Sequence, residues 1–500
     1  MSATRHLFKD SGYLALPGEF YAAAEAHPAP APRWIVFNQA LAEELGLPPD
    51  AATPDLLRQL AGGAPPEGRK NLALAYAGHQ FGQWNPRMGD GRAVLIGEIE
   101  APDGKFHDVH LKGSGPTVFA RRGDGRATLP AMLREYIVSE AMAGLDISST
   151  RSLAVVATGA QVFRDAPHHG AVLTRIARSH VRVGTFQYAA QGDAGQQQGP
   201  LLTRALADHC IARDYPEIAG TPEPYAAFFA AVVERQARLI AQWMLAGFIH
   251  GVMNTDNMAI SGETIDFGPC AFMDAFNSRQ VFSSIDSAGR YAYSRQPSVA
   301  MWNLARLAEA LLPLLGNDEA SALRLAQEKL EGFRSVYAAA FAEGMERKLG
   351  LTPGDARNAE FIERLWPTME HGRADFTLFF RRLTQIAAGA DEAGFLALFA
   401  GGEPQAHGQE AAFLAQWREL TADRDPALRL ADMQASNPIV IARNHRVEQA
   451  LERAAEGDLG LLERLSAALK NPFAEPAPGP EDLEAPPKPD ERVTETFCGT

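Results

Sequence analysis

The sequence predicts an α+β protein with two lobes, a mixed α/β small lobe followed by a mostly helical large lobe. Three observations lead to this fold class. Short runs rich in β-branched residues, with a period of two, are confined to about residues 71–188. Beyond residue 201, apolar residues recur at helical spacing along most of the chain. A chain of 500 residues is also too long for one small core.

The same patterns predict where the parts of the chain meet. We assign residues 1–190 to the N-terminal lobe and residues 201–470 to the helical C-terminal lobe. The polar stretch 191–200 between them is expected to be an exposed loop. Residues 471–500 are rich in proline and acidic residues, so we expect a mobile tail there.

Within the small lobe, four runs predict strands and one segment predicts a helix. The strands are expected at residues 92–99, 108–112, 171–176 and 180–186. Apolar residues from Pro130 to Met142 have helical spacing, and proline is acceptable in a first turn. The large lobe is expected to be helical at residues 202–213, 223–248, 299–314, 318–348, 359–388, 392–400, 409–420 and 443–470.

Composition excludes several classes of protein. A net charge of −14 and a pI near 5.5 disfavour a nucleic-acid-binding surface. The apolar segment 225–248 is interrupted by Glu234, Arg235 and Arg238, which favours a buried helix over a membrane span. The first ten residues lack the apolar core of a signal peptide, and three cysteines are too few for a disulfide scaffold. We therefore expect a cytoplasmic protein, and we expect it to act as a monomer.

The segment from His250 to Gly268 carries the strongest functional signal. His250-Gly-Val-Met-Asn-Thr-Asp-Asn257 is followed by Asp266-Phe-Gly268. Protein kinases place H-R-D-x-x-x-x-N before D-F-G, and the asparagine and the second aspartate bind the metal. On this pattern Asn257 and Asp266 are the metal ligands, with hard oxygen atoms that suit Mg²⁺ or Mn²⁺. We therefore expect a protein-kinase-like bilobal fold that binds a nucleotide and its metal between the lobes.

One position of this pattern does not fit kinase chemistry. Val252 occupies the place of the catalytic base, and a valine side chain cannot accept a proton. A carboxylate stands nearby at Asp256, directly before Asn257. Ordinary kinase chemistry is therefore not expected without change.

The pentapeptide Gly-Asp-Gly-Arg-Ala occurs twice, at Gly89–Ala93 and at Gly123–Ala127. Closely spaced glycines let backbone amides turn toward an anion, and the arginine adds a charged fork for phosphate oxygens. The first copy directly precedes a predicted strand, where a nucleotide-covering loop would lie. The second copy precedes the predicted helix that carries Glu135.

Lys112, between the two copies, is the candidate phosphate-binding lysine. Kinase-like folds pair such a strand lysine with a glutamate on the following helix, and Glu135 is the leading candidate. Arg175 and Arg182 are candidates for gripping a triphosphate, because guanidinium groups bind phosphate oxygens bidentately. Arg178 is equally close in sequence, so spacing alone does not choose among these three arginines.

These motifs extend into long stretches that together resemble one family. They are Tyr76-Ala-Gly-His-Gln-Phe-Gly-Gln-Trp-Asn-Pro, Gly89-Asp-Gly-Arg-Ala, His110-Leu-Lys-Gly-Ser-Gly-Pro-Thr, Arg122-Gly-Asp-Gly-Arg-Ala, Leu133-Arg-Glu-Tyr, Arg182-Val-Gly-Thr-Phe, Asn254-Thr-Asp-Asn-Met, Ile265-Asp-Phe-Gly-Pro-Cys, Asn437-Pro and Arg443-Asn-His. From roughly residue 5 to residue 470 the chain resembles the selenoprotein O family, pseudokinase-like protein adenylyltransferases of bacteria and mitochondria.

The resemblance implies that ATP binds in reverse, with its α-phosphate toward the acceptor. AMP would then pass to a Ser, Thr or Tyr hydroxyl of a protein substrate, and pyrophosphate would leave. The resemblance makes Asp256 the proton acceptor, Asn257 and Asp266 the metal ligands, and Glu135 the residue that orients Lys112. The residues that it implies for the nucleotide are Gly89, Gly91, Arg92, Lys112, Asp124, Gly125, Arg175, Arg182 and Asp266.

Two cysteines suggest a regulatory hypothesis. Cys270 lies two residues after Gly268, and Cys498 lies in the tail, where many members of this family carry selenocysteine or cysteine. A tail of about 28 residues is long enough to reach the site. A reversible Cys270–Cys498 disulfide is therefore a hypothesis for control of activity.

Three other functions stay open at this point. A true kinase would deliver the γ-phosphate with Asp256 as its base, and a related transferase would use UTP with Mn²⁺ to attach UMP. A pseudokinase scaffold would bind the nucleotide without chemistry. Retention of all five catalytic-type residues argues against the scaffold; they are Lys112, Glu135, Asp256, Asn257 and Asp266.

Overall fold

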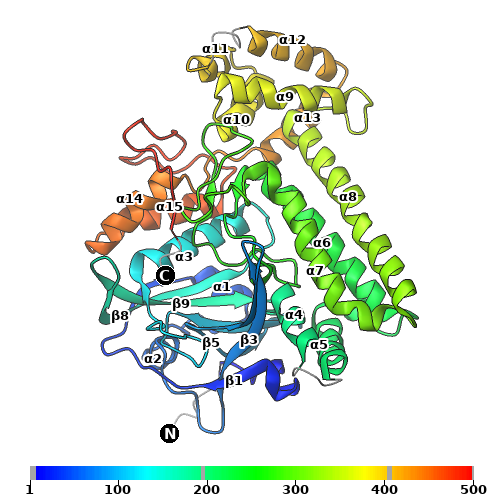
Figure 1. Cartoon of the computed structure of the whole chain (residues 1–500). Helices are drawn as coiled ribbons and strands as arrows, with labels where there is room; N and C mark the ends of the chain where they lie inside the picture. The colour runs from blue at the N-terminus through cyan, green and yellow to red at the C-terminus, as the bar shows by residue number, and fades with distance from the viewer. Residues whose placement is uncertain (1–6, 193–197, 403–407, 498–500) are drawn as a thin grey trace.

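One antiparallel sheet organises the N-terminal part of the protein (Figure 1). The computed structural model describes residues 7–192, 198–402 and 408–497. Within these ranges neighbouring strands follow the order β1-β3-β5-β6-β9-β8-β2, with β4 paired to β3 and β7 to β9. The strands are β1 (Tyr21–Ala24), β2 (Arg33–Phe37), β3 (Asn71–Gln80), β4 (Gln83–Gly89), β5 (Ala93–Glu100), β6 (Phe106–Lys112), β7 (Ala127–Thr128), β8 (Arg151–Phe163) and β9 (Pro167–Ala177). The predicted strands at 92–99, 108–112 and 171–176 are confirmed as parts of β5, β6 and β9.

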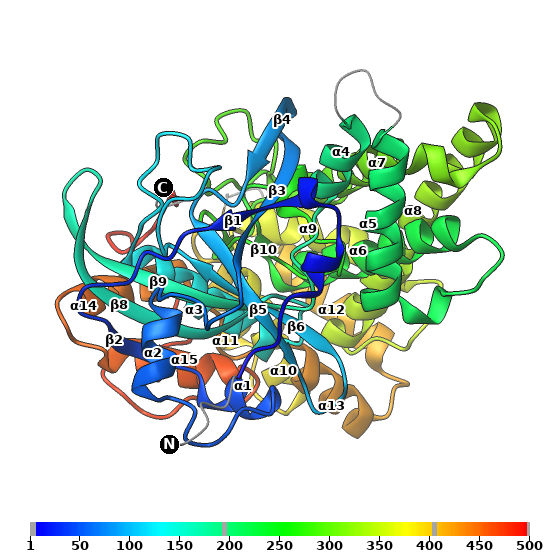
Figure 2. The same cartoon turned by 90° about the horizontal axis from the view of Figure 1, so that it is seen from below.

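Different parts of the chain cover the two faces of the sheet. Alternate strand residues point to opposite faces. Leu173 packs in the larger core, on the face toward α3 (Leu129–Gly144). Its neighbour Val172 packs in a smaller core, on the face toward α1 (Gln39–Glu44) and α2 (Pro54–Leu60). Figure 2, seen from below, shows α2 in front of the sheet, so side chains on the α3 face point toward the rest of the molecule.

The predicted helix at 130–142 is confirmed as α3. Pro130 lies in its first turn, where a backbone N–H has no partner within the helix. The helix is buried on most of its surface, including the charged side chains of Arg134 and Glu135. Buried charged side chains need partners, and those of Arg134 and Glu135 are described with the candidate active site below.

The strand predicted at 180–186 is wrong, because this segment begins α4 (Val183–Gln191). The backbone N–H of Arg182, at the N-cap position, donates to Thr185 Oγ1, which closes the first turn. A Cβ at Gly184 would lie 2.2 Å from the carbonyl oxygen of Ala77, so the glycine lets α4 pack directly on β3. Tertiary packing thus outweighs the β-branched residues that suggested a strand.

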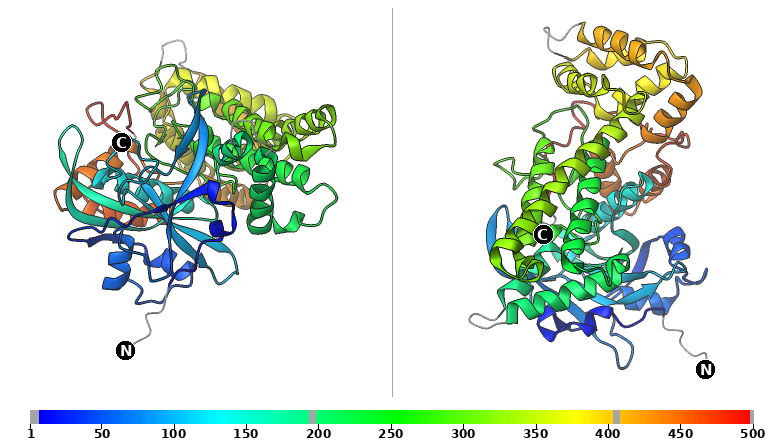
Figure 3. Two further views of the ribbon diagram at one scale, coloured as in Figure 1. Left: turned by 60° about the horizontal axis from the view of Figure 1, so that its bottom comes forward. Right: turned by 90° about the vertical axis from the view of Figure 1, so that its right-hand side faces the viewer.

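Helices make up most of the chain after residue 198. They are α5 (Gln198–Asp214), α6 (Pro224–Ala246), α7 (Gln296–Leu315), α8 (Glu319–Leu349), α9 (Asn358–Gly372), α10 (Phe376–Ala387), α11 (Ala393–Leu396), α12 (Gln409–Thr421), α13 (Pro426–Ser436), α14 (Asn444–Ala455) and α15 (Gly460–Lys470). The fold is therefore α+β, with a sheet-rich N-terminal part and a helical C-terminal part. Figures 1 and 3 place α9, α11 and α12 at the end farthest from the sheet.

The helix predictions need three corrections. The segment 359–388 is two helices, because Arg373 adopts a left-handed φ of 51° and Asp375 caps the start of α10. The segment 443–470 is likewise divided into α14 and α15. Helix α13 was not predicted, although Asp425-Pro426 is a typical helix start. Of the loop expected at 191–200, residues 193–197 lie outside the described residues, and 198–200 already belong to α5.

Residues of the predicted tail make contacts with the rest of the protein. Residues 471–497 form no helix or strand, yet they lie against the protein through specific contacts. Leu483 is buried, and the Glu484 carbonyl accepts a hydrogen bond from Arg443 Nε at 3.0 Å. The hydroxyl of Thr496 donates to the Pro269 carbonyl at 2.6 Å, beside the Asp-Phe-Gly segment. A proline-rich sequence lacks regular hydrogen bonding, but these side chains still hold it in place.

None of the helices in the described ranges combines the length and the apolar character that a membrane span requires.

Candidate active site

The register of two strands brings Lys112 and Arg175 to one face of the sheet. Lys112 on β6 pairs with Leu173 on β9, and Arg175 lies two residues further along β9, opposite His110. Residues two apart on a strand share a face, so both cations point toward α3. This face meets the helical part of the protein.

Two cations and two carboxylates interlock at this position. Lys112 Nζ forms ion pairs with Glu135 and, at 2.6 Å, with Asp266 Oδ1. Arg175 Nη2 contacts the same two acids, Glu135 Oε2 at 3.1 Å and Asp266 Oδ1 at 2.7 Å. Burial alone would raise the pKa of Asp266, but Arg175 and Lys112 hold this pKa well below its usual value. The cluster therefore keeps both acids ionised, and Glu135 holds Lys112 toward Asp266.

Arg134, beside Glu135 on α3, fastens the segment that follows Asp266. Its Nε donates to the Gly268 carbonyl at 2.9 Å, and its Nη2 donates to the Cys270 carbonyl at 2.7 Å. Nη2 also donates to Asn444 Oδ1 at 2.8 Å, at the start of α14. One helix thus positions both the lysine partner and the backbone of the Asp-Phe-Gly segment. In the sequence, Arg134 stands out only as part of the Leu133-Arg-Glu-Tyr stretch.

Asp256 lies in a short 3-10 turn (Thr255–Asn257) and is buried. Its Oδ1 atom has no hydrogen-bond partner within the part of the chain that the structure describes. Burial raises the pKa of Asp256 to about 7, although Arg182 acts to lower it. A Cβ at Gly78 on β3 would lie 2.7 Å from Oδ1, so only glycine at this position leaves room for the carboxylate.

The rest of the loop holds Asn257 and Asp266 in defined orientations. Asn257 Nδ2 donates to the Val252 carbonyl at 2.9 Å, which leaves the amide Oδ1 as the atom available to a cation. His250 Nε2 shares a hydrogen bond with the Ile265 carbonyl at 2.8 Å and so links the loop to the Asp266 segment. Val252 itself is buried and apolar.

Hard oxygen ligands from Asn257 and Asp266 fit a magnesium-like ion, which usually takes one or two protein side chains plus substrate phosphates. Within the described ranges, no group of three or more His, Cys, Asp and Glu side chains could hold a metal by itself.

Arg182 reaches the site and Arg178 does not. Arg182 is buried, lies over the Tyr76 ring at 4.6 Å and stands 3.7 Å from Asp90 Oδ1. Arg178 instead donates to the Asp214 carbonyl at 3.2 Å. Asp90 also shares a 3.0 Å hydrogen bond with His110 Nε2 on β6, so it links Arg182 to that strand. Sequence reasoning missed Tyr76 and Asp90, although both lie within the motifs quoted above.

The two Gly-Asp-Gly-Arg-Ala copies stand in loops that touch. The Thr117 N–H donates to the Gly91 carbonyl at 3.3 Å, and the Gly113 N–H donates to the Arg92 carbonyl at 2.7 Å. The Phe119 ring packs against Gly89. These contacts place Gly89, Gly91 and Arg92 beside the strand end that carries Lys112.

The second copy lies further out. Gly125 has a left-handed φ of 65°, and a Cβ there would lie 2.1 Å from backbone atoms of Gly115 and Pro116, so glycine is required. Asp124 is half-exposed and forms an ion pair with Arg164 Nη1 at 2.9 Å. The Asp124 carboxylate is therefore paired with Arg164. It takes no part in the ion pairs that join Lys112 and Arg175 to Glu135 and Asp266.

Cys270 is buried, and its thiol donates to the Phe267 carbonyl at 3.1 Å. Cys498, its proposed partner, lies outside the described residues.

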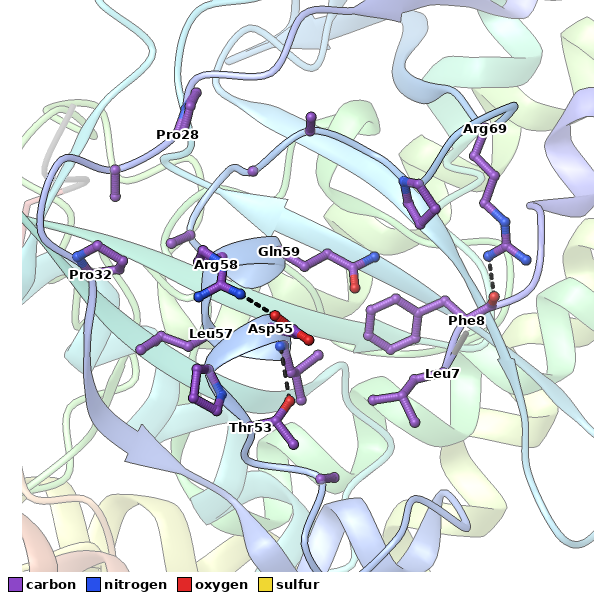
Figure 4. A pocket seen from close by; sticks show the side chains of 18 of the residues that line it. Leu7, Phe8, Pro28, Pro32, Thr53, Asp55, Leu57, Arg58, Gln59 and Arg69 are labelled. Carbon is purple, nitrogen blue, oxygen red and sulfur yellow. Dashed lines mark hydrogen bonds and ion pairs between the residues drawn. The ribbon is translucent and has the colours of Figure 1, made fainter. Parts of the chain in front are cut away.

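A large cavity lies apart from this site. It has a volume of about 1230 Å³, and Figure 4 shows its lining of prolines and residues of α2. Arg58 and Asp55 within it form an ion pair with each other. None of the candidate site residues lines this cavity, so we do not assign it to the nucleotide.

Known proteins match this chain over nearly its whole length. Residues 5–470 match the family described as "Protein adenylyltransferase SelO". A protein nucleotidyltransferase YdiU of Bradyrhizobium sp. (strain ORS 278) is 51% identical over 501 residues, covering 99% of this chain and 100% of the relative. The protein of the same name in Rhodopseudomonas palustris (strain BisB5) is 52% identical over 503 residues, with coverage of 99% and 100%. That of Rhizobium etli is 50% identical over 497 residues, with coverage of 98% and 97%.

Proposed function

The chain belongs to the SelO family of protein adenylyltransferases and is therefore an enzyme of nucleotidyl transfer, and we propose that it transfers AMP from ATP to Ser, Thr or Tyr hydroxyls of proteins. The observation that supports this proposal is the burial and hydrogen bonding of the Asp256 carboxylate. It is a buried carboxylate, one oxygen of which has no partner among the described residues, and it stands directly before Asn257, the proposed metal ligand. Val252 occupies the position where a kinase has its base.

The nucleotide is proposed to lie between the sheet and the helical part, as in a protein-kinase-like bilobal fold. Lys112, Arg175 and Arg182 would neutralise the phosphates, with Glu135 orienting Lys112. The glycine loops would supply backbone N–H groups to the same phosphates. Their residues are Gly89, Gly91, Arg92, Asp124 and Gly125. Asp124 would leave Arg164 to contact the nucleotide.

Asn257 and Asp266 would hold Mg²⁺ or Mn²⁺. The ion supplies charge neutralisation for the phosphate oxygens when it is bound. Asp266 now pairs with Lys112 and Arg175, and these cations would turn toward the phosphates as the nucleotide enters.

The transfer step needs positioning more than covalent help from the protein. The acceptor hydroxyl oxygen attacks the α-phosphorus, and the bond from this phosphorus to the oxygen that bridges to the β-phosphate breaks. Pyrophosphate leaves with the bonding electrons. The acceptor proton passes to the carboxylate of Asp256, whose Oδ1 has no hydrogen-bond partner within the described residues.

The test compares ATP labelled at the α-phosphate with ATP labelled at the γ-phosphate. Each is incubated with the full-length enzyme and Mg²⁺ or Mn²⁺, and the protein is then resolved on a denaturing gel. Label from the α-position alone is expected. Label from the γ-position alone would indicate a kinase, and transfer only from α-labelled UTP with Mn²⁺ would indicate attachment of UMP. Intact ATP binding with no label from any source would indicate a scaffold.

Regulation by a Cys270–Cys498 disulfide is a separate proposal. Thr496 is bonded to the residue that precedes Cys270, which supports an approach of the tail to this segment. Higher activity of reduced than of oxidised protein is expected, and Cys498→Ser should abolish the difference. Equal activity of the two forms would contradict the proposal.

A further inference from the structure

A surface beside the catalytic loop is not used by the proposed chemistry. It is formed by the tip of the β3–β4 hairpin, the segment 286–291 and α7. The hydroxyl of Tyr291 donates to Asn254 Oδ1 at 2.6 Å, and the N–H of Phe81 donates to the same oxygen at 3.0 Å. The N–H of His79 donates to Thr255 Oγ1 at 2.7 Å. This surface is thus fastened directly to the turn that carries Asp256.

Arg290 is the distinctive residue of this surface. Its guanidinium lies over the Trp302 ring, 4.8 Å from the centroid, and 5.8 Å from that of Tyr291. Its Nε is buried and has no hydrogen-bond partner within residues 7–192, 198–402 and 408–497, nor does an ion pair to a carboxylate form there. The nearby carboxylate of Asp286 instead accepts the backbone N–H groups of Arg290 and Tyr291, both at 2.8 Å.

Arg306 lies on the same ring and differs from Arg290 in having a carboxylate partner, although its Nε also lacks a hydrogen-bond partner within the described residues. It lies 5.0 Å from the Trp302 centroid, on the helix α7 that carries Trp302. Its Nη2 forms an ion pair with Glu309 at 2.6 Å. Arg290 has the same aromatic neighbour but no carboxylate partner within the described residues, so its positive charge is available to an anion.

A row of rings leads from Arg290 to solvent. The His79 ring lies 5.2 Å from Trp302 and 4.8 Å from Trp84 on the hairpin. Trp84 is 43% exposed. Burial lowers the pKa of His79, and Arg306 and Arg290 act in the same direction, against the hydrogen bond to Gln187. An exposed aromatic row that ends in an arginine has the composition of a protein-binding surface.

The hairpin also sets the order of the parts of the site. Gly89, at its base, belongs to the nucleotide loop, and Gly78, midway, touches Asp256. Gly82, at its tip, faces Arg290, whose guanidinium carbon lies 3.5 Å from where a Cβ of residue 82 would stand. Strand β3 ends at Gln80 and residues 81–82 form the turn, so the two strand steps from Gly78 to Gln80 span roughly 7 Å. Nucleotide, proton acceptor and Arg290 therefore follow one another along the hairpin, with Arg290 on the side away from the phosphates.

The geometry points to Arg290 as the docking group for an acidic side chain of the acceptor protein, held against Trp302 and the exposed Trp84. This inference rests on the proposed function, which places the acceptor hydroxyl at Asp256. In an extended peptide, the strand steps and the turn together put the acid about two to four residues from the modified hydroxyl. The protein as a whole carries a net charge of −14, so an acidic partner needs such a local cation to bind.

The experiment uses two fluorescent peptides with a single central serine among Gly and Ala residues. One carries Glu three and four residues to each side, and the other carries Gln at these positions. Binding to the full-length enzyme is measured by anisotropy, with transfer from α-labelled ATP measured in parallel. We expect the Glu peptide to bind about tenfold more tightly. Arg290→Gln should abolish this preference, and Arg290→Lys should retain most of it.

Arg306→Gln is the matched control, because Arg306 contacts the same ring but is already paired with Glu309. It should leave the preference unchanged. An unchanged preference in Arg290→Gln would overturn the inference. So would a loss of ATP affinity in that variant with the peptide preference intact, because Arg290 would then belong to the nucleotide site. Preferential binding without any label transfer would count against the proposed function, whereas transfer without preference would count against the docking group.

Discussion

Asp266 and Asp256 are buried carboxylates of one site, but their surroundings differ. Asp266 lies between Lys112 and Arg175, and these cations hold its pKa well below its usual value. Asp256 lies against Gly78 with one oxygen unpartnered, and burial raises its pKa to about 7. A carboxylate that is paired with two cations stays ionised and can hold a further cation or its ligands in place. A buried carboxylate with one unpaired oxygen is suited to exchange a proton.

The first prediction separates the two acids by their effect on transfer and on binding. Asp256→Asn keeps the shape of the side chain and removes the proton acceptor, so we expect turnover to fall about 10²–10⁴-fold with ATP affinity nearly unchanged. Asp266→Asn should weaken binding of ATP with Mg²⁺ as well as turnover. Calorimetric ATP titration and α-label transfer measure the two effects. Equal loss of ATP affinity in both variants would remove the distinction.

The second prediction removes one negative charge from the ion-pair cluster around Asp266. Glu135→Gln takes one carboxylate from between Lys112 and Arg175 and leaves two buried cations with Asp266 alone. We expect the free energy of unfolding to drop by about 3 kcal/mol. Urea denaturation, followed by far-ultraviolet circular dichroism, measures this loss. The exposed variant Glu331→Gln on α8 serves as a control and should change stability little.

The third prediction introduces a methyl group beside the Asp256 carboxylate. Gly78→Ala places a methyl group 2.7 Å from Asp256 Oδ1, so the carboxylate must move. We expect turnover to fall about tenfold without a change in ATP affinity, because only the proton acceptor is displaced. Gly18→Ala, whose new methyl group meets no atom within 4 Å, is the matched control. Full turnover in Gly78→Ala would mean that the position of Asp256 is not critical.

The fourth prediction extends the comparison to a buried cation in the helical part. Lys348 Nζ has one hydrogen bond, to the Ser436 carbonyl at 3.2 Å, and burial lowers its pKa from 10.5 to about 7. Between these values the unfolded chain binds more protons, so this group makes stability rise as pH increases from about 7 to 10.5. Lys348→Met should raise the free energy of unfolding at pH 7 by on the order of 1 kcal/mol and flatten this dependence. Urea denaturation at pH 7 and pH 9.5 tests both effects, and a steeper dependence in the variant would contradict them.

Sequence order was enough to group Lys112, Glu135 and Asp266. The order of strand, helix and loop is written in the chain, and period-two and helical patterns located the strand and the helix on either side of the turn. The α+β class followed from the same periodicities. Three of the four predicted strands are present, and α3 begins within one residue of its predicted start.

Contacts between distant segments left no local signal. Gly78 and Asp256 are far apart in sequence, and so are Gly82 and Arg290, and a single sequence does not record their proximity. The setting of Arg182 was misjudged because Val183 and Thr185 favour a strand by propensity, whereas Gly184 allows a helix to pack on β3. In the tail, composition indicated the absence of helix but gave no sign of the bond from Thr496 to Pro269.

The register between β6 and β9 limits where members of this family can gain or lose residues. One extra residue within β6 would turn Lys112 to the opposite face, where Val109 and Leu111 fill the smaller core. Extra residues in the turn between β8 and β9, at 164–166, would leave both strands in phase. Length changes among relatives should therefore gather in such turns, and an alignment of the family should be free of gaps across the strands that carry Lys112 and Arg175.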